Sequence, residues 1–156
     1  MPLIVLEGLD GAGKTTQTEL LKERLESRGF RYEYLHFLRF DAPVYGGLIA
    51  RFLRGELGGI DAVDPYLVAL LFAGDRADAA AMIRKWLARG KYVLLDRYVN
   101  SNIAYQCAKV EGGEAREMLR RWILDLEYGH NAIPRPDVSL FLDVPFRFTE
   151  RSLTAP

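Results

Sequence analysis

Short apolar runs alternate along this chain with longer segments of helical periodicity. The apolar runs predict strands at about 3–7, 30–37, 92–95 and 138–144. The helical spacing predicts helices over about 16–28, 48–54, 65–89, 102–109, 114–128 and 146–153. Asp64 followed by Pro65 is typical of a helix start, and Gly29 and Gly90 are typical of helix ends. Strands that alternate with helices predict an α/β fold with a mostly parallel sheet covered by helices on both faces.

Composition adds limits on domain number and partners. The 156 residues are 49% hydrophobic, which predicts a single domain over 1–156. Basic and acidic residues number 21 each, so no net charge would attract nucleic acid or an anionic membrane. Cys107 is the single cysteine, which excludes an internal disulfide, and the apolar start that ends at Glu7 is too short for a secretory signal. We therefore expect a cytoplasmic protein with neither a nucleic-acid nor a membrane partner.

A glycine-rich stretch between the first strand and the first helix has the spacing of a phosphate-binding loop (P-loop). The residues are Gly8, Leu9, Asp10, Gly11, Ala12, Gly13, Lys14 and Thr15, with Thr16 at the start of the helix. Glycines let successive backbone N–H groups point at phosphate oxygens, and the helix amino terminus favours the same anion. Lys14 would neutralise the outer phosphates of ATP, and the Thr15 hydroxyl would ligate Mg²⁺. The alternative is a glycine-rich turn without a ligand.

Two charged residues stand at the end of the third predicted strand. Asp96 and Arg97 occupy the carboxyl end of a parallel strand, where open α/β sheets bind their ligands. Asp96 can hold Mg²⁺ through water, and Arg97 can stabilise charge on a transferring phosphoryl group.

The long helix carries a pair of residues that suits a planar base. Phe72 and Arg76 are four residues apart and share one helix face. The ring can stack on a base while the guanidinium donates to a carbonyl oxygen. The alternatives are a core position for Phe72 and surface pairing of Arg76 with Asp75 or Asp78.

Several segments together resemble the thymidylate kinase family, and the resemblance covers essentially the whole chain. They are Glu7–Gln17, Phe37–Phe40, Leu71–Arg76, Asp96–Tyr105 and Pro136–Val144. The resemblance implies a P-loop NTPase fold and transfer of the ATP γ-phosphate to thymidine 5′-monophosphate (dTMP), which gives thymidine diphosphate for dTTP synthesis. It also implies ATP and Mg²⁺ as cofactors and a homodimer.

The resemblance assigns a catalytic set and substrate ligands. The catalytic set is Lys14, Arg97, Asp10 and Arg39. Asp10 would hydrogen-bond the sugar 3′-hydroxyl, and Arg39 and Arg97 would bind the monophosphate. The alternatives are helix capping by Asp10 and a solvated loop position for Arg39. This chain has Leu38 where the family often has proline.

The same resemblance assigns the rest of the pocket. Asn102 would face the base, and Gln106 would contribute to the base pocket. Tyr105 would pack at C2′ of the sugar, where its ring would exclude a ribose hydroxyl. The alternatives are a helix cap for Asn102 and core packing for Tyr105.

The predicted sheet has four strands, whereas P-loop domains of this type usually have at least five. We therefore expect a fragment, or a form that lacks the carboxyl-terminal lid and last strand of the family. Forms without a basic residue at the position of Ala12 usually supply catalytic arginines from that lid, and Arg151 matches an arginine that packs on the adenine of ATP. Two alternatives follow: a kinase of another nucleotide or nucleoside, and a catalytically deficient nucleotide-binding module.

Overall fold

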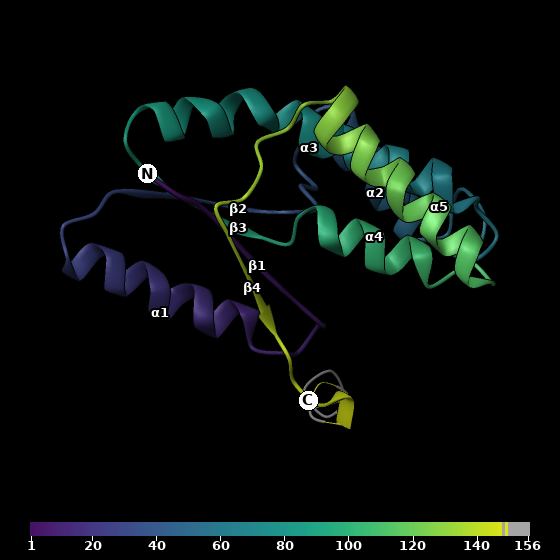
Figure 1. Ribbon diagram of the computed structural model, residues 1–156, viewed down its shortest axis with the longest axis horizontal. Coiled ribbons are helices and arrows are strands. Elements are labelled where there is room, and N and C mark those ends of the chain that lie inside the picture. Colours follow the sequence, from purple (N-terminus) through teal and green to yellow (C-terminus); the bar gives the residue numbers. More distant parts are fainter. Residues whose placement is uncertain (148, 150–156) are drawn as a thin grey trace. The chain divides into compact units, whose positions relative to one another are not determined.

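The structure, a computed structural model, describes residues 1–147 and 149 (Figure 1). The chain divides into two compact units. The first contains residues 1–36, 82–98 and the described residues from 135 onward, and the second contains residues 37–81 and 99–134. The expectation of a single domain over 1–156 stays a prediction.

A parallel sheet forms the centre of the first unit. Its strands are β1 (Leu3–Gly8), β2 (Tyr32–His36), β3 (Tyr92–Asp96) and β4 (Val138–Leu142), in the order β2-β3-β1-β4. The register places Asp96 beside both Leu6 of β1 and His36 of β2. The carboxyl ends of three strands therefore meet around Asp96.

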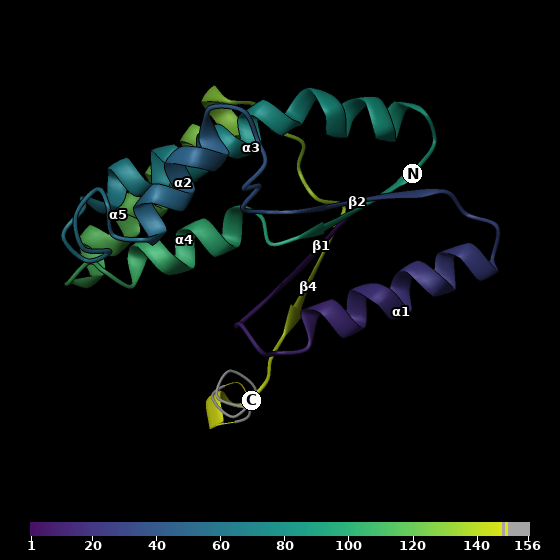
Figure 2. The ribbon, with the colours of Figure 1, turned by 180° about the vertical axis from the view of Figure 1, so that it is seen from behind.

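Apolar side chains of the two central strands form the core of this unit. Those exposed by no more than 2% are Leu3, Val5, Leu6, Val93, Leu94 and Leu95. Such near-continuous apolar runs are typical of parallel strands that are buried on both faces. Helix α1 (Lys14–Ser27) lies on one side of the strands, and the last turns of α3 (Pro65–Ala88) lie on the other (Figure 2). The predicted α/β fold with a parallel sheet flanked by helices is confirmed.

Helices build the second unit. They are α2 (Tyr45–Leu53), the first part of α3, α4 (Val99–Cys107) and α5 (Gly113–Leu124), followed by the π-helix η1 (Asp125–His130). In Figures 1 and 2 these helices gather together. A cluster of buried apolar side chains holds α2 against α3, and it comprises Ile49, Phe52, Val68 and Phe72.

The observed helix boundaries agree with those predicted from the sequence at some positions and differ at others. Asp64 caps α3 as predicted, because its Oδ1 accepts a hydrogen bond from the Tyr66 N–H over 2.8 Å. The helix predicted over 102–109 starts earlier, at Val99, and the helix predicted over 114–128 becomes π-helical at Asp125. Of the helix predicted over 146–153, residues 146, 147 and 149 are helical and the others lie outside the described residues. Within the described chain, none of the helices is both long and apolar enough to cross a membrane.

Candidate active site

The loop between β1 and α1 has the backbone of a phosphate-binding loop. Gly11 and Gly13 have φ angles of 78° and 86°, a region that side chains other than glycine rarely adopt. Gly13 is also the N-cap of α1. Because the first N–H groups of a helix have no acceptor within it, the N–H groups of Lys14 and Thr15 are available to an anion.

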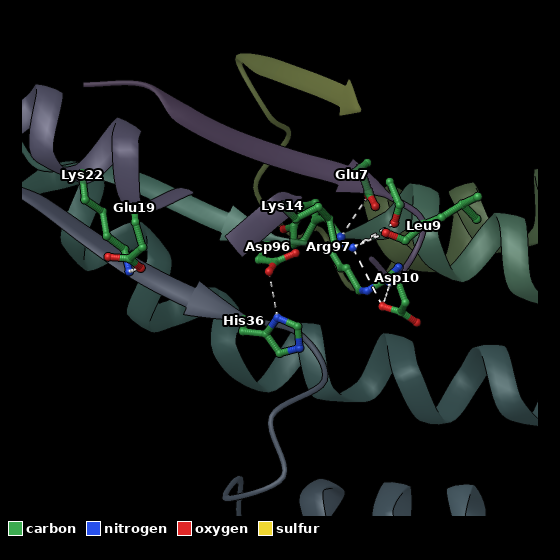
Figure 3. A network of polar contacts seen from close by, with 11 residues as sticks. Glu7, Leu9, Asp10, Lys14, Glu19, Lys22, His36, Asp96 and Arg97 are labelled. Carbon is green, nitrogen blue, oxygen red and sulfur yellow. Dashed lines mark hydrogen bonds and ion pairs between the residues drawn. The ribbon is translucent and has the colours of Figure 1, made fainter. Parts of the chain in front are cut away.

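Lys14 folds back over its own loop (Figure 3). Its Nζ donates hydrogen bonds to the carbonyl oxygens of Leu9 and Gly8 over 2.8 and 3.1 Å, and it lies 3.9 Å from Oδ1 of Asp10. Burial lowers the pKa of Lys14, and the nearby positive charge of Arg97 lowers it further, whereas nearby carboxylates oppose both effects. The ammonium group is placed so that phosphate oxygens can replace the two carbonyls.

Asp96 is the last residue of β3, and Arg97 begins the turn that follows (Figure 3). Oδ2 of Asp96 lies 3.2 Å from Nδ1 of His36, and its Oδ1 is buried without a hydrogen-bond partner among the described residues. Arg97 has a φ of 66°, and its N–H donates to the Leu6 carbonyl over 2.9 Å. The Arg97 Nη2 lies 2.5 Å from Oδ1 of Asp10. The structure therefore joins the phosphate loop to the turn through a charged pair.

Glu7 supports this turn, and the sequence reasoning missed it. The side chain is buried in β1, and its Oε1 accepts a hydrogen bond from the N–H of Tyr98 over 3.0 Å. That bond anchors the residue immediately after Arg97. The available signal was a carboxylate inside an otherwise apolar strand, because a buried charge requires partners.

Thr15 and Asp96 offer oxygen ligands of the kind that Mg²⁺ prefers. The unpartnered Oδ1 of Asp96 fits a cation or a water that the cation binds, since a buried carboxylate oxygen needs a compensating charge or donor. Among the residues that the structure describes, no group of three or more His, Cys, Asp or Glu could hold a metal ion.

In the second unit, two carboxylates of α3 hold Arg39. Its Nε donates to Oδ1 of Asp75 over 2.8 Å, and its Nη2 donates to Oδ2 of Asp78 over 2.7 Å. The backbone N–H of Arg39 also donates to Oδ2 of Asp75 over 3.1 Å. Arg39 is therefore not a solvated loop arginine, since 11% of its side chain is exposed.

Arg76 pairs with neither of these two carboxylates. It is buried and forms a two-pronged ion pair with Glu127: Nε donates to Oε2 over 2.7 Å, and Nη2 donates to Oε1 over 2.5 Å. Its Cζ also lies 6.0 Å from the ring centre of Phe37. The alternative of surface pairing with Asp75 or Asp78 is wrong, because those carboxylates bind a different arginine.

Phe72 belongs to the core of the second unit. It lies on α3 one turn before Arg76, and its ring centre is 6.0 Å from that of Phe52 in an edge-on arrangement. The core alternative for Phe72 is therefore correct. Stacking of its ring on a nucleobase stays a prediction.

Helix α4 contributes two buried amides. Asn102 Nδ2 donates to Oε1 of Glu127 over 3.0 Å and to the Ala69 carbonyl over 3.1 Å. Gln106 Nε2 donates weakly to Oδ1 of Asn102 over 3.4 Å, while its own Oε1 is buried without a partner in the described part of the chain. Tyr105 is 43% exposed. The helix-cap alternative for Asn102 and the core alternative for Tyr105 are both wrong.

The structure thus gathers the predicted residues into three groups. Asp10, Lys14, Asp96 and Arg97 meet in the first unit, and Arg39 pairs with α3 in the second. Arg76 and Asn102 form the third group, around Glu127, and Gln106 joins it through Asn102. Arg151 lies outside the described residues. Glu127 was missed because its helical surroundings are rich in charge, and nothing in that pattern distinguishes a buried carboxylate from solvated ones.

Known proteins are similar to this chain in sequence and in architecture. The sequence model of the thymidylate kinase family matches residues 6–154. The chain is 38% identical over 143 residues to the thymidylate kinase of Mycobacterium tuberculosis. This alignment covers 91% of this chain and 65% of that protein. It is 40% identical over 149 residues to a probable thymidylate kinase of Thermococcus kodakarensis, which covers 92% and 67% respectively.

A solved structure agrees with these sequence matches. The thymidylate kinase of Candida albicans is similar with a TM-score of 0.77 at 28% identity, over 96% of this chain and 66% of that one. The chain spans about two thirds of the length of the relatives that it matches, 65% in the mycobacterial case. The match extends over nearly the whole of this sequence, from the phosphate loop to beyond the fourth strand, and this chain therefore belongs to the thymidylate kinase family.

Proposed function

We propose that this protein transfers the γ-phosphate of ATP to dTMP and forms thymidine diphosphate for dTTP synthesis. The observation that carries the proposal is the charged pair between Asp10 of the phosphate loop and Arg97 after β3, in a member of the thymidylate kinase family. Phosphoryl transfer depends on positioning and on charge neutralisation rather than on a covalent intermediate. Lys14 and Arg97 supply positive charge next to the loop that would hold the phosphates.

ATP binds through the phosphate loop in this proposal. Backbone N–H groups between Gly8 and Thr16 hold the phosphate oxygens, and Lys14 neutralises the outer two phosphates. The orientation of Lys14 toward the carbonyls of its own loop supports this role. By its position in the family pattern, Arg151 packs on the adenine.

Mg²⁺ binds beside the same loop, at the Thr15 hydroxyl and, through water, at Asp96. A bound ion would neutralise part of the charge on the phosphates. The unpartnered Oδ1 of Asp96 supports the assignment. His36, which contacts the other carboxylate oxygen, fixes the orientation of the acid.

Charged side chains hold the monophosphate in this proposal. Asp10 accepts a hydrogen bond from the sugar 3′-hydroxyl, and Arg97 binds the monophosphate and stabilises charge on the transferring group. Arg39 is a further monophosphate ligand. Its pairing with Asp75 and Asp78 supports this role, because a guanidinium fixed by two carboxylates loses little freedom on binding an anion.

The base and sugar are recognised in the second unit. Phe72 stacks on the thymine, Arg76 donates to its O4, and Asn102 and Gln106 complete the base pocket. Burial of the three polar side chains supports this role, since a buried polar group discriminates strongly against a ligand that leaves it unpaired. Tyr105 excludes the ribose hydroxyl.

The resemblance to the family supports a proposal for the quaternary and cellular setting. We propose that the chain forms one kinase domain over 1–156, acts as a cytoplasmic homodimer, and takes a small-molecule substrate rather than nucleic acid. The equal numbers of acidic and basic residues support the last point.

The test is a coupled ATP-consumption assay on the purified chain, with its intact mass verified. The substrates are the monophosphates of thymidine, deoxyuridine, uridine, cytidine, adenosine and guanosine, and Lys14→Ala is the inactive reference. The proposal expects robust turnover selective for dTMP. Turnover that favours another monophosphate would assign a different kinase activity, and tight dTMP binding without turnover would indicate a binding module.

A further inference from the structure

We propose that Glu127 is a positioning residue for recognition of the nucleobase. This inference rests on the proposed dTMP site, in which Arg76 and Asn102 face the base. One carboxylate connects these two side chains, which come from different helices. The role of Glu127 is to fix both in the orientation that thymine requires.

The geometry leaves Glu127 little freedom. Its side chain is fully buried, and Oε2 accepts from Nε of Arg76 over 2.7 Å. Oε1 accepts twice, from Nη2 of Arg76 over 2.5 Å and from Nδ2 of Asn102 over 3.0 Å. A parallel fork of this kind fixes the plane of a guanidinium as well as its distance. The ring centre of Phe37 lies 6.0 Å from the Arg76 Cζ.

The ion pair determines which donors of Arg76 remain for a ligand. The two hydrogen bonds to Glu127 come from Nε and Nη2, and Nη1 donates no hydrogen bond to any of the residues that the structure describes. The Nη1 group is therefore the part of Arg76 that can donate to a base carbonyl.

The same hydrogen-bond network leaves one acceptor oxygen available to a base. Gln106 donates to Oδ1 of Asn102, and its buried Oε1 has no partner in the described chain. A donor on Arg76 and an acceptor on Gln106 match the O4 and N3–H of thymine. Cytosine presents an amino group in place of O4, so the same groups disfavour it.

Charge explains why a carboxylate is needed at this position. An arginine buried without a counter-charge is strongly unfavourable, and Glu127 compensates the charge of Arg76. A glutamine at this position would offer one acceptor oxygen where Arg76 and Asn102 now use two. Glu127 lies in the π-helix η1, a type of irregularity that occurs often at functional sites.

Calorimetric binding provides the test, because it does not require turnover. We would measure the Kd of dTMP, dCMP and ATP for the wild type, Glu127→Asp, Glu127→Gln and the control Glu117→Gln. Glu117 is a half-buried residue of α5 that pairs with Arg120 and Arg121. Glu127→Asp keeps the charge but shortens the side chain, so it serves if the glutamine variant fails to fold. The ratio of two Kd values in one preparation does not depend on the folded fraction.

The proposal expects both Glu127 variants to weaken dTMP binding about tenfold or more, and to lose most of the preference for dTMP over dCMP. ATP binding should be unchanged, and Glu117→Gln should behave like the wild type. Adding Glu127→Gln to Arg76→Gln should cause little further loss, because Glu127 acts through Arg76.

A merely structural role would give a different result. It would lower the melting temperature while leaving the Kd values and the dTMP preference of the folded protein unchanged, and that outcome overturns the proposal. If the wild-type chain binds none of these monophosphates, the proposed dTMP site itself is wrong. If the wild type prefers dTMP and both Glu127 variants keep that preference, only the role of Glu127 is wrong.

Discussion

The Nζ of Lys14 donates to the carbonyl oxygen of Leu9, five residues earlier in the chain, over 2.8 Å. The lysine is thereby held above its own phosphate loop before any phosphate binds. Such preorganisation matters because a charge that is already positioned needs no rearrangement when the reaction begins. The loop thus combines a fixed cation with the free N–H groups of a helix amino terminus.

Replacement of Lys14 should impair ATP binding and phosphoryl transfer without unfolding the protein. We expect Lys14→Met to weaken ATP binding and to lower kcat about 10²- to 10³-fold, as for loss of one preorganised donor. Lys22→Met is the matched control, since Lys22 lies on the same helix and pairs with Glu19. Calorimetry with ATP and circular dichroism measure binding and fold. Wild-type ATP affinity in the Lys14 variant would contradict the assigned role.

Tyr105 should determine the choice between deoxyribose and ribose. Its ring is 43% exposed on α4, so removing it leaves no large core cavity. We expect Tyr105→Ala to raise the relative kcat/KM for the ribonucleotide form of thymidine monophosphate about tenfold or more, because the steric exclusion at C2′ is lost. Tyr105→Phe keeps the ring and should keep the discrimination. Equal discrimination by the wild type and the alanine variant would refute this function.

Gly46 and Gly47 are neighbours in α2 with opposite steric surroundings. A Cβ on Gly46 would lie 2.3 Å from the Phe40 carbonyl oxygen, whereas a Cβ on Gly47 would meet nothing within 4 Å. We expect Gly46→Ala to lower the free energy of unfolding by about 1–3 kcal/mol. Gly47→Ala should raise it by about 0.5–1 kcal/mol, because alanine favours the helix. Urea unfolding of both variants is the measurement, and equal effects would contradict the backbone geometry near Phe40.

Tyr34 should make the free energy of unfolding fall as the pH rises in the alkaline range. Burial, together with the negative charge of Asp96, raises the pKa of Tyr34 to about 12 from an ordinary value of 10. Between these pH values the unfolded chain has released the phenolic proton and the folded chain retains it. The free energy of unfolding that this group contributes is therefore fully present below about pH 10 and is lost as pH rises toward 12.

The measurement is urea unfolding of the wild type and Tyr34→Phe at several pH values from about 9 upward. We expect the wild type to lose stability more steeply than the variant, which has no proton to retain. Parallel losses of stability in the two proteins would show that folding does not raise the pKa of the Tyr34 hydroxyl.

The local sequence pattern was sufficient to predict the buried strands of the first unit and the sheet edge at which its candidate site lies. The apolar runs of β1 and β3 predict buried parallel strands, and the carboxyl ends of such strands lie at one edge of a sheet. Asp96 and the phosphate loop could therefore be assigned to one edge from their positions in the chain. The structure confirms that edge, with Asp96 beside Leu6 and His36.

Long-range pairing was not predictable from the chain alone. Arg76 has acidic neighbours on its own helix, yet it pairs with Glu127, 51 residues away. The carboxylate of Asp75 forms an ion pair with Arg39 instead. Which carboxylate a buried arginine reaches depends on how helices pack, and helical periodicity carries no information about that. The π-helix that carries Glu127 was predicted as the continuation of an ordinary helix for the same reason.

Direct identification of the product tests the central claim. The intact chain would be incubated with Mg²⁺, ATP and dTMP, and thymidine diphosphate and ADP would be quantified by chromatography, with Arg97→Ala in parallel. We expect equal amounts of thymidine diphosphate and ADP from the wild type and a loss of both with Arg97→Ala, whose fold remains intact. Failure of the wild type to form thymidine diphosphate, or unchanged turnover by the Arg97 variant, would contradict that claim.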